Sequence, residues 1–129
     1  MEKPIVLTFS LRMNATESLE TIKERVEAVL GCQLQGGSLL GSPAFVGKVL
    51  GISIALLLWR GIGGTYVYQL HGLPDRRALR DVDSLDVEWD EIRIDQAIID
   101  LLRRQGAGEW REPSFEECQA EGNYDLEDI

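Results

Sequence analysis

The chain has 129 residues, of which 44% are hydrophobic, and its net charge is −9. A chain of this size and composition can form one domain around one core without a metal ion or a disulfide. The negative charge argues against nucleic acids, polyanions and anionic membranes as direct partners, because each would repel the chain at long range.

The first residues predict a strand that is followed by a helix. Apolar and polar residues alternate from Ile5 to Met13, which is the period of a half-buried strand. Asn14 is a candidate N-cap, and apolar residues then recur at helical spacing from Leu19 to Leu30. Gly31 is suited to end this helix in the left-handed conformation.

Glycines divide residues 32–72 into short apolar runs, a texture typical of antiparallel strands joined by tight turns. The run from Ile52 to Trp59 predicts a central strand that is covered on both faces. The most membrane-like stretch, from Val49 to Trp59, has only about half of the roughly 20 residues needed to cross a bilayer. The glycines of residues 61–64 join two strands, so they lack the helix N-terminus of a phosphate-binding loop and form a hairpin. Residues 65–71 alternate again, with Tyr66 and Tyr68 on one face.

Apolar and acidic residues alternate from Leu85 to Asp90, which predicts a strand with an acidic outer face. Apolar residues from Ile94 to Leu102 then stand at helical spacing, and we expect Asp95 to cap this second helix. The acidic residues 114–129 show no periodicity and predict a weakly ordered tail. The expected fold is therefore one α+β domain over residues 1–113, with a mainly antiparallel sheet of five or six strands and two helices packed on one face.

Residues able to carry out chemistry are few. His71 is the only histidine, and we expect it to be an ordinary polar residue at a strand end. The two cysteines, Cys32 and Cys118, lie far apart and fit no metal-ligand spacing. We expect them to be free thiols, with a single bridge as the alternative. The first residues show no signal peptide, so we expect a cytoplasmic protein. Because residues suited to catalysis or metal binding are few, we also expect a protein that is not an enzyme and has no cofactor or metal.

The acidity is concentrated in the second half of the chain. Residues 1–72 have a charge balance of +1, whereas residues 73–129 carry seven basic and seventeen acidic residues, a balance of −10. Seven acidic residues fall within Asp81–Asp95, where Arg93 is the only basic residue. Such a cluster of like charges destabilises a fold unless a cation neutralises it. Trp110 is also a candidate, since tryptophan is enriched at interfaces, with a position capping the core as the alternative. We therefore predict a binding surface for a basic protein partner that contains Asp81, Asp83, Asp86, Glu88, Asp90, Glu91 and Trp110.

This order of elements resembles that of the small immunity proteins of bacterial polymorphic toxin systems. The resemblance covers most of the chain: an alternating strand (Ile5–Met13), a helix (Leu19–Leu30), glycine-punctuated strands (Ser38–His71), an acidic strand (Leu85–Asp90), a helix (Gln96–Arg104) and the final Trp110-Arg111-Glu112-Pro113. It implies a cytoplasmic protein that binds one cognate toxin domain and blocks it. A phage-encoded inhibitor of a host nucleic-acid enzyme and a small enzyme or ligand-binding domain are the alternatives.

Overall fold

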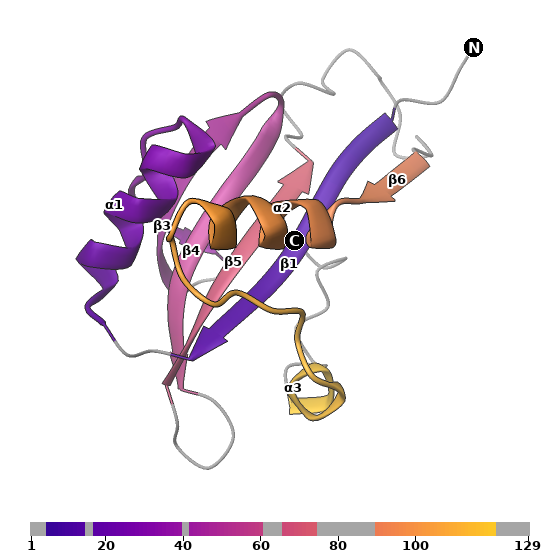
Figure 1. The fold of residues 1–129 in the computed structure, drawn as a ribbon. Coiled ribbons are helices and arrows are strands. Elements are labelled where there is room, and N and C mark those ends of the chain that lie inside the picture. The colour runs from indigo at the N-terminus through magenta and orange to yellow at the C-terminus, as the bar shows by residue number, and fades with distance from the viewer. Residues whose placement is uncertain (1–4, 15–16, 40–41, 61–65, 75–89, 121–129) are drawn as a thin grey trace.

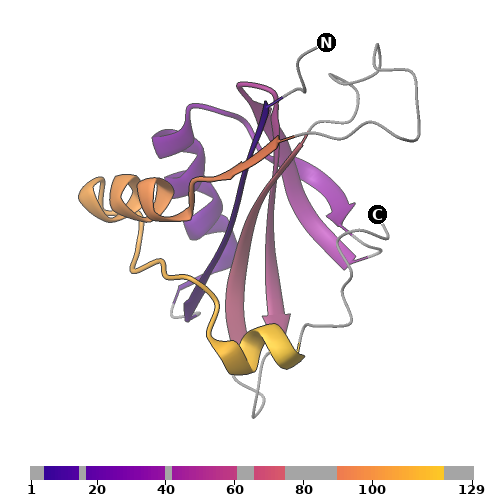
Figure 2. The same ribbon diagram turned by 90° about the vertical axis from the view of Figure 1, so that its right-hand side faces the viewer.

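The chain folds into a six-stranded sheet with two helices on one face and a third, short helix near one end of the sheet (Figures 1 and 2). A computed structural model describes residues 5–14, 17–39, 42–60, 66–74 and 90–120. In chain order the elements are β1 (Ile5–Asn14), α1 (Leu19–Leu30), β2 (Gln35–Leu39), β3 (Ser42–Val49), β4 (Ile52–Arg60), β5 (Tyr66–Pro74), β6 (Asp90–Arg93), α2 (Asp95–Arg104) and α3 (Phe115–Ala120).

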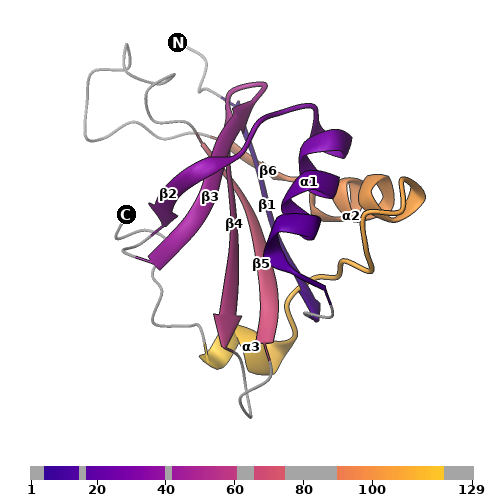
Figure 3. The same ribbon diagram turned by 90° about the vertical axis from the view of Figure 1, so that its left-hand side faces the viewer.

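The strands lie in the order β2-β3-β4-β5-β1-β6. Four neighbouring pairs are antiparallel, and β6 alone runs parallel to its neighbour, β1. Helices α1 and α2 lie on the same side of this sheet (Figure 3). The predicted α+β class is confirmed, and so is the mainly antiparallel sheet with two helices on one face.

Strand β4 is the central strand that its apolar run predicted. Its residues Ile54 to Leu57 are buried although their side chains alternate between the two faces of the sheet. Arg60 at its end pairs with Tyr66 of β5, so β4 and β5 are antiparallel neighbours, and the expected hairpin loop between them lies outside the described residues. At its other end, Leu50 and Gly51 have φ values of 49° and 78° and form the tight turn from β3. Positive φ at both residues is the geometry of the turn type that suits a two-residue hairpin.

The ends of α1 were predicted with mixed success. Gly31 has a φ of 69° and its N–H donates to the carbonyl of Glu27, which confirms the expected left-handed C-cap. The N-cap is Ser18, whose hydroxyl accepts from the N–H of Thr21 at 3.3 Å, so the expectation for Asn14 is wrong. Asn14 instead extends β1, because that strand pairs with β5 through its last residue.

The main core lies between the helices and the sheet. Phe9, Leu11 and Met13 of β1 point into it, as the alternation predicted, and they meet Val26 of α1 and Leu102 of α2 among the other buried residues. Gly72 of β5 lies opposite Phe9, and a Cβ atom at this position would overlap the Phe9 ring. Glycine therefore allows the ring to lie across β5.

The other face of β1 is also buried, which the sequence did not predict. Thr8 and Arg12 alternate with the core residues and are only 7% and 4% exposed. Gln69 and His71 lie beside them on β5 and are buried as well. The prediction that β1 is only half-buried is therefore wrong: Thr8 and Arg12 on its other face are also buried.

Candidate functional site

The acidic binding surface predicted from the sequence is described in part. Asp90 and Glu91 lie in β6, and every residue of this strand is exposed. Asp81, Asp83, Asp86 and Glu88 lie outside the described residues, as does the rest of the predicted acidic strand before Asp90. The described strand runs from Asp90 to Arg93, at the edge of the sheet beside β1.

Asp90 and Glu91 differ in their surroundings. Asp90 pairs with Ile5 and Glu91 with Val6, so the two side chains project to opposite faces of the sheet. Glu91 Oε1 accepts a hydrogen bond from the Thr8 hydroxyl at 2.5 Å. Carboxylates on opposite faces of a strand are poorly placed to bind one cation together.

Arg93 is already engaged within the protein. Its Nε and Nη2 atoms donate to the two carboxylate oxygens of Asp95, each at 3.0 Å, and Asp95 also accepts from the N–H of Ser10 at 2.8 Å. Burial alone would raise the pKa of Asp95, but Arg93 and the Ser10 N–H hold that pKa below its ordinary value. Asp95 is the first residue of α2, and its hydrogen bond from Ser10 links this helix to β1. The N-cap position belongs to Ile94, so the expectation that Asp95 caps the helix is wrong.

Trp110 is not part of a binding surface. Its side chain is fully buried, and its Nε1 atom donates to the carbonyl of Ala107 at 3.0 Å. The proposed interface role of Trp110 is therefore wrong. The chain that follows this residue reaches β1, where the backbones of Arg111 and Arg12 exchange hydrogen bonds of 2.7 and 2.8 Å.

A chain of polar side chains on the face of the sheet opposite the helices was missed from the sequence. An Arg12 Nη1 atom donates to Ser10 Oγ at 2.9 Å, Ser10 Oγ lies 3.2 Å from Nδ1 of His71, and Nε2 of His71 lies 3.0 Å from Oε1 of Gln69. The one available signal was that polar residues stand two apart on both strands, Ser10 and Arg12 on β1 and Gln69 and His71 on β5. His71 thus lies inside β5 rather than at a strand end.

The partners of His71 fix its tautomer. The Oε1 atom of Gln69 can only accept, so Nε2 of His71 carries the proton and donates it. A neutral imidazole has one such proton, and Nδ1 therefore accepts from the Ser10 hydroxyl. Burial, with a smaller effect from the charge of Arg12, lowers the pKa of His71 to about 3. His71 is consequently neutral at pH 7.

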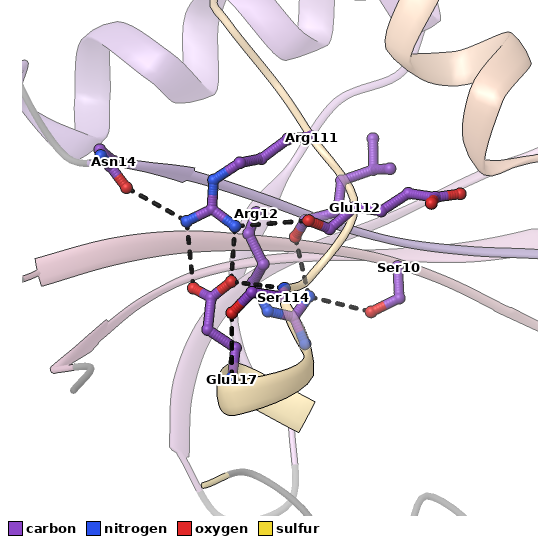
Figure 4. A network of polar contacts seen from close by, with 8 residues as sticks. Ser10, Arg12, Asn14, Arg111, Glu112, Ser114 and Glu117 are labelled. Atoms are coloured by element: carbon purple, nitrogen blue, oxygen red, sulfur yellow. Dashed lines mark hydrogen bonds and ion pairs between the residues drawn. The ribbon is translucent and has the colours of Figure 1, made fainter. Parts of the chain in front are cut away.

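An ion pair ties α3 to the rest of the fold (Figure 4). The Arg111 guanidinium donates to both carboxylate oxygens of Glu117, at 2.5 and 3.1 Å, and to Oδ1 of Asn14 at 3.2 Å. Ser114 and Glu117 exchange two further hydrogen bonds at the start of the helix. Arg111 is the main reason that the pKa of Glu117 falls to about 2. The predicted weakly ordered tail therefore begins too early, since Phe115–Ala120 is helical.

We expect Glu117→Gln to destabilise the protein by about 2 kcal/mol, because it removes a carboxylate that accepts charge-assisted hydrogen bonds and is shielded from solvent. Chemical denaturation at pH 7 measures this change. Glu116→Gln is the matched control, since Glu116 is the exposed neighbour and its substitution changes the net charge equally. Equal stabilities of the two variants would contradict a structural role for the ion pair.

The described residues hold no group of three or more His, Cys, Asp or Glu side chains that could bind a metal ion. Cys32 is half-buried, burial raises the pKa of its thiol, and both it and the exposed Cys118 are free thiols. None of the helices within the described ranges has the length and hydropathy needed to cross a membrane.

Comparison with known proteins places the chain in no family. No family model matches it, and no curated protein or solved structure is significantly similar to it. The fold defines only a class: an α+β protein whose six-stranded sheet is antiparallel except at one edge.

Proposed function

We propose that this protein is a non-catalytic inhibitor that neutralises a cognate toxin domain by binding it in a one-to-one complex through its acidic surface. The observation that carries the proposal is the concentration of acidic charge after residue 72, together with the exposure of Asp90 and Glu91 at the β6 edge. A toxin that acts on nucleic acids presents Lys and Arg side chains to phosphates, and carboxylates compete for the same groups. The expected resident location is the cytoplasm, where such a toxin would act.

The hydrogen bonding of Arg93 within the protein supports this proposal. Among the described residues, Arg93 is the basic residue nearest to Asp90 and Glu91 in the sequence, and its guanidinium donates hydrogen bonds to Asp95. The exposed carboxylate of Asp90 therefore keeps its charge available for cations from a partner, whereas the charge of Glu91 also acts on Arg93. Attraction between such a surface and a basic target speeds association, and salt weakens it.

The low pKa and the hydrogen bonds of His71 also support a non-catalytic function. Proton transfer at neutral pH is most efficient when the pKa of the catalytic group lies near the working pH. The pKa of His71 is about 3, and both of its ring nitrogens already have partners within the protein. The only histidine is thus poorly suited to act as a general base, which favours binding over catalysis.

The test measures association kinetics with the partner recovered by affinity capture from the native source. We expect Asp86→Asn/Glu88→Gln/Asp90→Asn to slow association roughly tenfold at low salt and to flatten its salt dependence, because rim charges act mainly on the association rate. Glu20→Gln/Glu24→Gln/Glu116→Gln is the matched control, since it removes the same charge from exposed positions on α1 and α3.

Unchanged rates for the first variant at both ionic strengths would show that the acidic surface is only solvated. Equal slowing by both triple variants would show that net charge, and not this surface, steers the encounter. A captured partner with no toxic activity on expression without this protein would contradict the inhibitory role.

A further inference from the structure

Strand β2 forms the edge of the sheet opposite β6. Within the described part of the chain it pairs with β3 alone, and residues Gln35 to Ser38 are exposed. Natural edge strands carry charges, prolines or bulges that prevent pairing with another chain. The sequence of β2, QGGSL, has neither charge nor proline, and its register with β3 is continuous. Among the described residues, this edge therefore lacks the usual protection against strand addition.

The register shows which backbone groups of β2 point outward. In the two-residue turn, Val49 and Ile52 form the hydrogen-bonded pair that closes the β3–β4 hairpin. Because hydrogen bonding alternates along a strand, odd-numbered residues of β3 bond to β4 and even-numbered ones bond to β2. Ala44 therefore bonds to Gly37. The N–H and C=O groups of Gly36 and Ser38 consequently point away from the sheet.

Charge favours a second copy of this chain as the occupant of the edge. Two molecules of net charge −9 repel each other, and the repulsion is smallest where their surfaces carry no charge. The residues from Ala28 to Gly47 include none of the chain's Asp, Glu, Lys or Arg residues, and β2 lies in the middle of this segment. The acidic β6 lies at the far edge of the sheet.

We propose that the protein forms a twofold-symmetric dimer in which β2 pairs antiparallel with β2 of a second copy, centred on Gly37. Gly36 then exchanges both of its backbone hydrogen bonds with Ser38 of the partner subunit, and Ser38 does the same with Gly36 of the partner subunit. The two Gly37 residues face each other as a non-hydrogen-bonded pair, where cross-strand residues approach to about 4.5 Å between Cα atoms. Glycine places no side chain in that narrow gap.

The two six-stranded sheets would join into one continuous sheet, with a β6 strand at each outer edge. A five-residue strand buries less surface than a standard interface, so the dimer is weak and its population depends on concentration. This inference is independent of the proposed toxin contact, because it concerns the opposite edge of the sheet.

Sedimentation equilibrium of the full chain tests the proposal, over a range from about 10 µM to about 1 mM that spans weak association. We expect the average mass to rise from that of one chain toward that of two. Hydrogen exchange locates the contact: the amides of Gly36 and Ser38 should exchange several-fold more slowly as the concentration rises, while the Gly37 amide, which bonds to β3, should not change.

Two variants separate this edge from any other contact. Ser38→Lys places a charge at the pair, and Ser38→Pro removes an outward N–H without disturbing the bonds to β3. Both should remain at the mass of one chain across the whole range. Gln105→Lys is the matched control for charge, since Gln105 is exposed at the end of α2, and it should associate like the wild type. Circular dichroism verifies that each variant is folded.

A wild-type mass of one chain at every concentration would overturn the proposal. Dimers of both Ser38 variants with wild-type affinity would overturn it too, because the contact would then lie elsewhere. A wild type that stays monomeric alone and protects Gly36 and Ser38 only in a complex with another protein would assign the edge to that protein.

Discussion

Replacing Trp110 with alanine is expected to lower the free energy of unfolding by about 4 kcal/mol, the cost typical of truncating a large buried aromatic side chain. The indole is fully buried in the core, and its Nε1 atom donates to the carbonyl of Ala107. Small proteins are stable by only about 5–15 kcal/mol, so this variant should lose a large share of its stability. Denaturation monitored by circular dichroism measures the effect.

Two further variants serve as controls for Trp110→Ala. Phe115→Ala removes an aromatic ring that is 76% exposed and should change stability by no more than about 0.5 kcal/mol. Trp110→Phe keeps most of the buried volume and loses the hydrogen bond to Ala107, so its cost should lie between the other two. If Trp110→Ala unfolded at the same denaturant concentration as the wild type, Trp110 would not be a core residue.

Acidification from pH 7.5 to pH 5 is expected to lower the free energy of unfolding by about 2 kcal/mol through His71 alone. Its pKa is about 3 in the folded protein and 6.5 without the fold. Between these values the unfolded chain takes up a proton that the folded protein does not, so stability falls as the pH falls. The contribution is complete above pH 6.5 and is lost progressively toward pH 3.

His71→Gln isolates this effect, because glutamine can form hydrogen bonds and does not titrate. The chain has no second histidine, and Asp95 and Glu117 have lowered pKa values, so they titrate below this range in both proteins. Denaturant unfolding at several pH values should show a change within about 0.5 kcal/mol for the variant between pH 7.5 and pH 5. A variant that loses as much stability as the wild type would contradict the buried, neutral state of His71.

Local sequence patterns predicted the helices and strands better than they predicted which faces of these elements are buried. The alternation in β1 identified Phe9, Leu11 and Met13 as one face, and Gly31 ended α1 where expected. Alternation shows which residues share a face of a strand, but it does not show whether other groups bury that face. Arg12 therefore looked like a solvated residue, although it is 4% exposed.

The candidate site was harder to predict for a related reason. A single tryptophan near glycines and a proline is compatible with an interface and with a core, and only tertiary packing places Trp110 in the core. The hydrogen bond between Ser10 and His71 joins residues 61 positions apart, and the one between Thr8 and Glu91 joins residues 83 positions apart. No local spacing in a single sequence reports such contacts.

The position of β1 between β5 and the edge strand β6 also affects how the chain folds during synthesis. Strand β1 leaves the ribosome first among the described strands, yet both of its neighbours in the sheet, β5 and β6, come late in the sequence. At about 5–20 residues per second, the roughly 80 residues up to β6 take on the order of 4 to 16 s to make. Strands β3, β4 and β5 can meanwhile pair with their sequence neighbours. We therefore expect β1 to enter the sheet after β3, β4 and β5 have begun to pair.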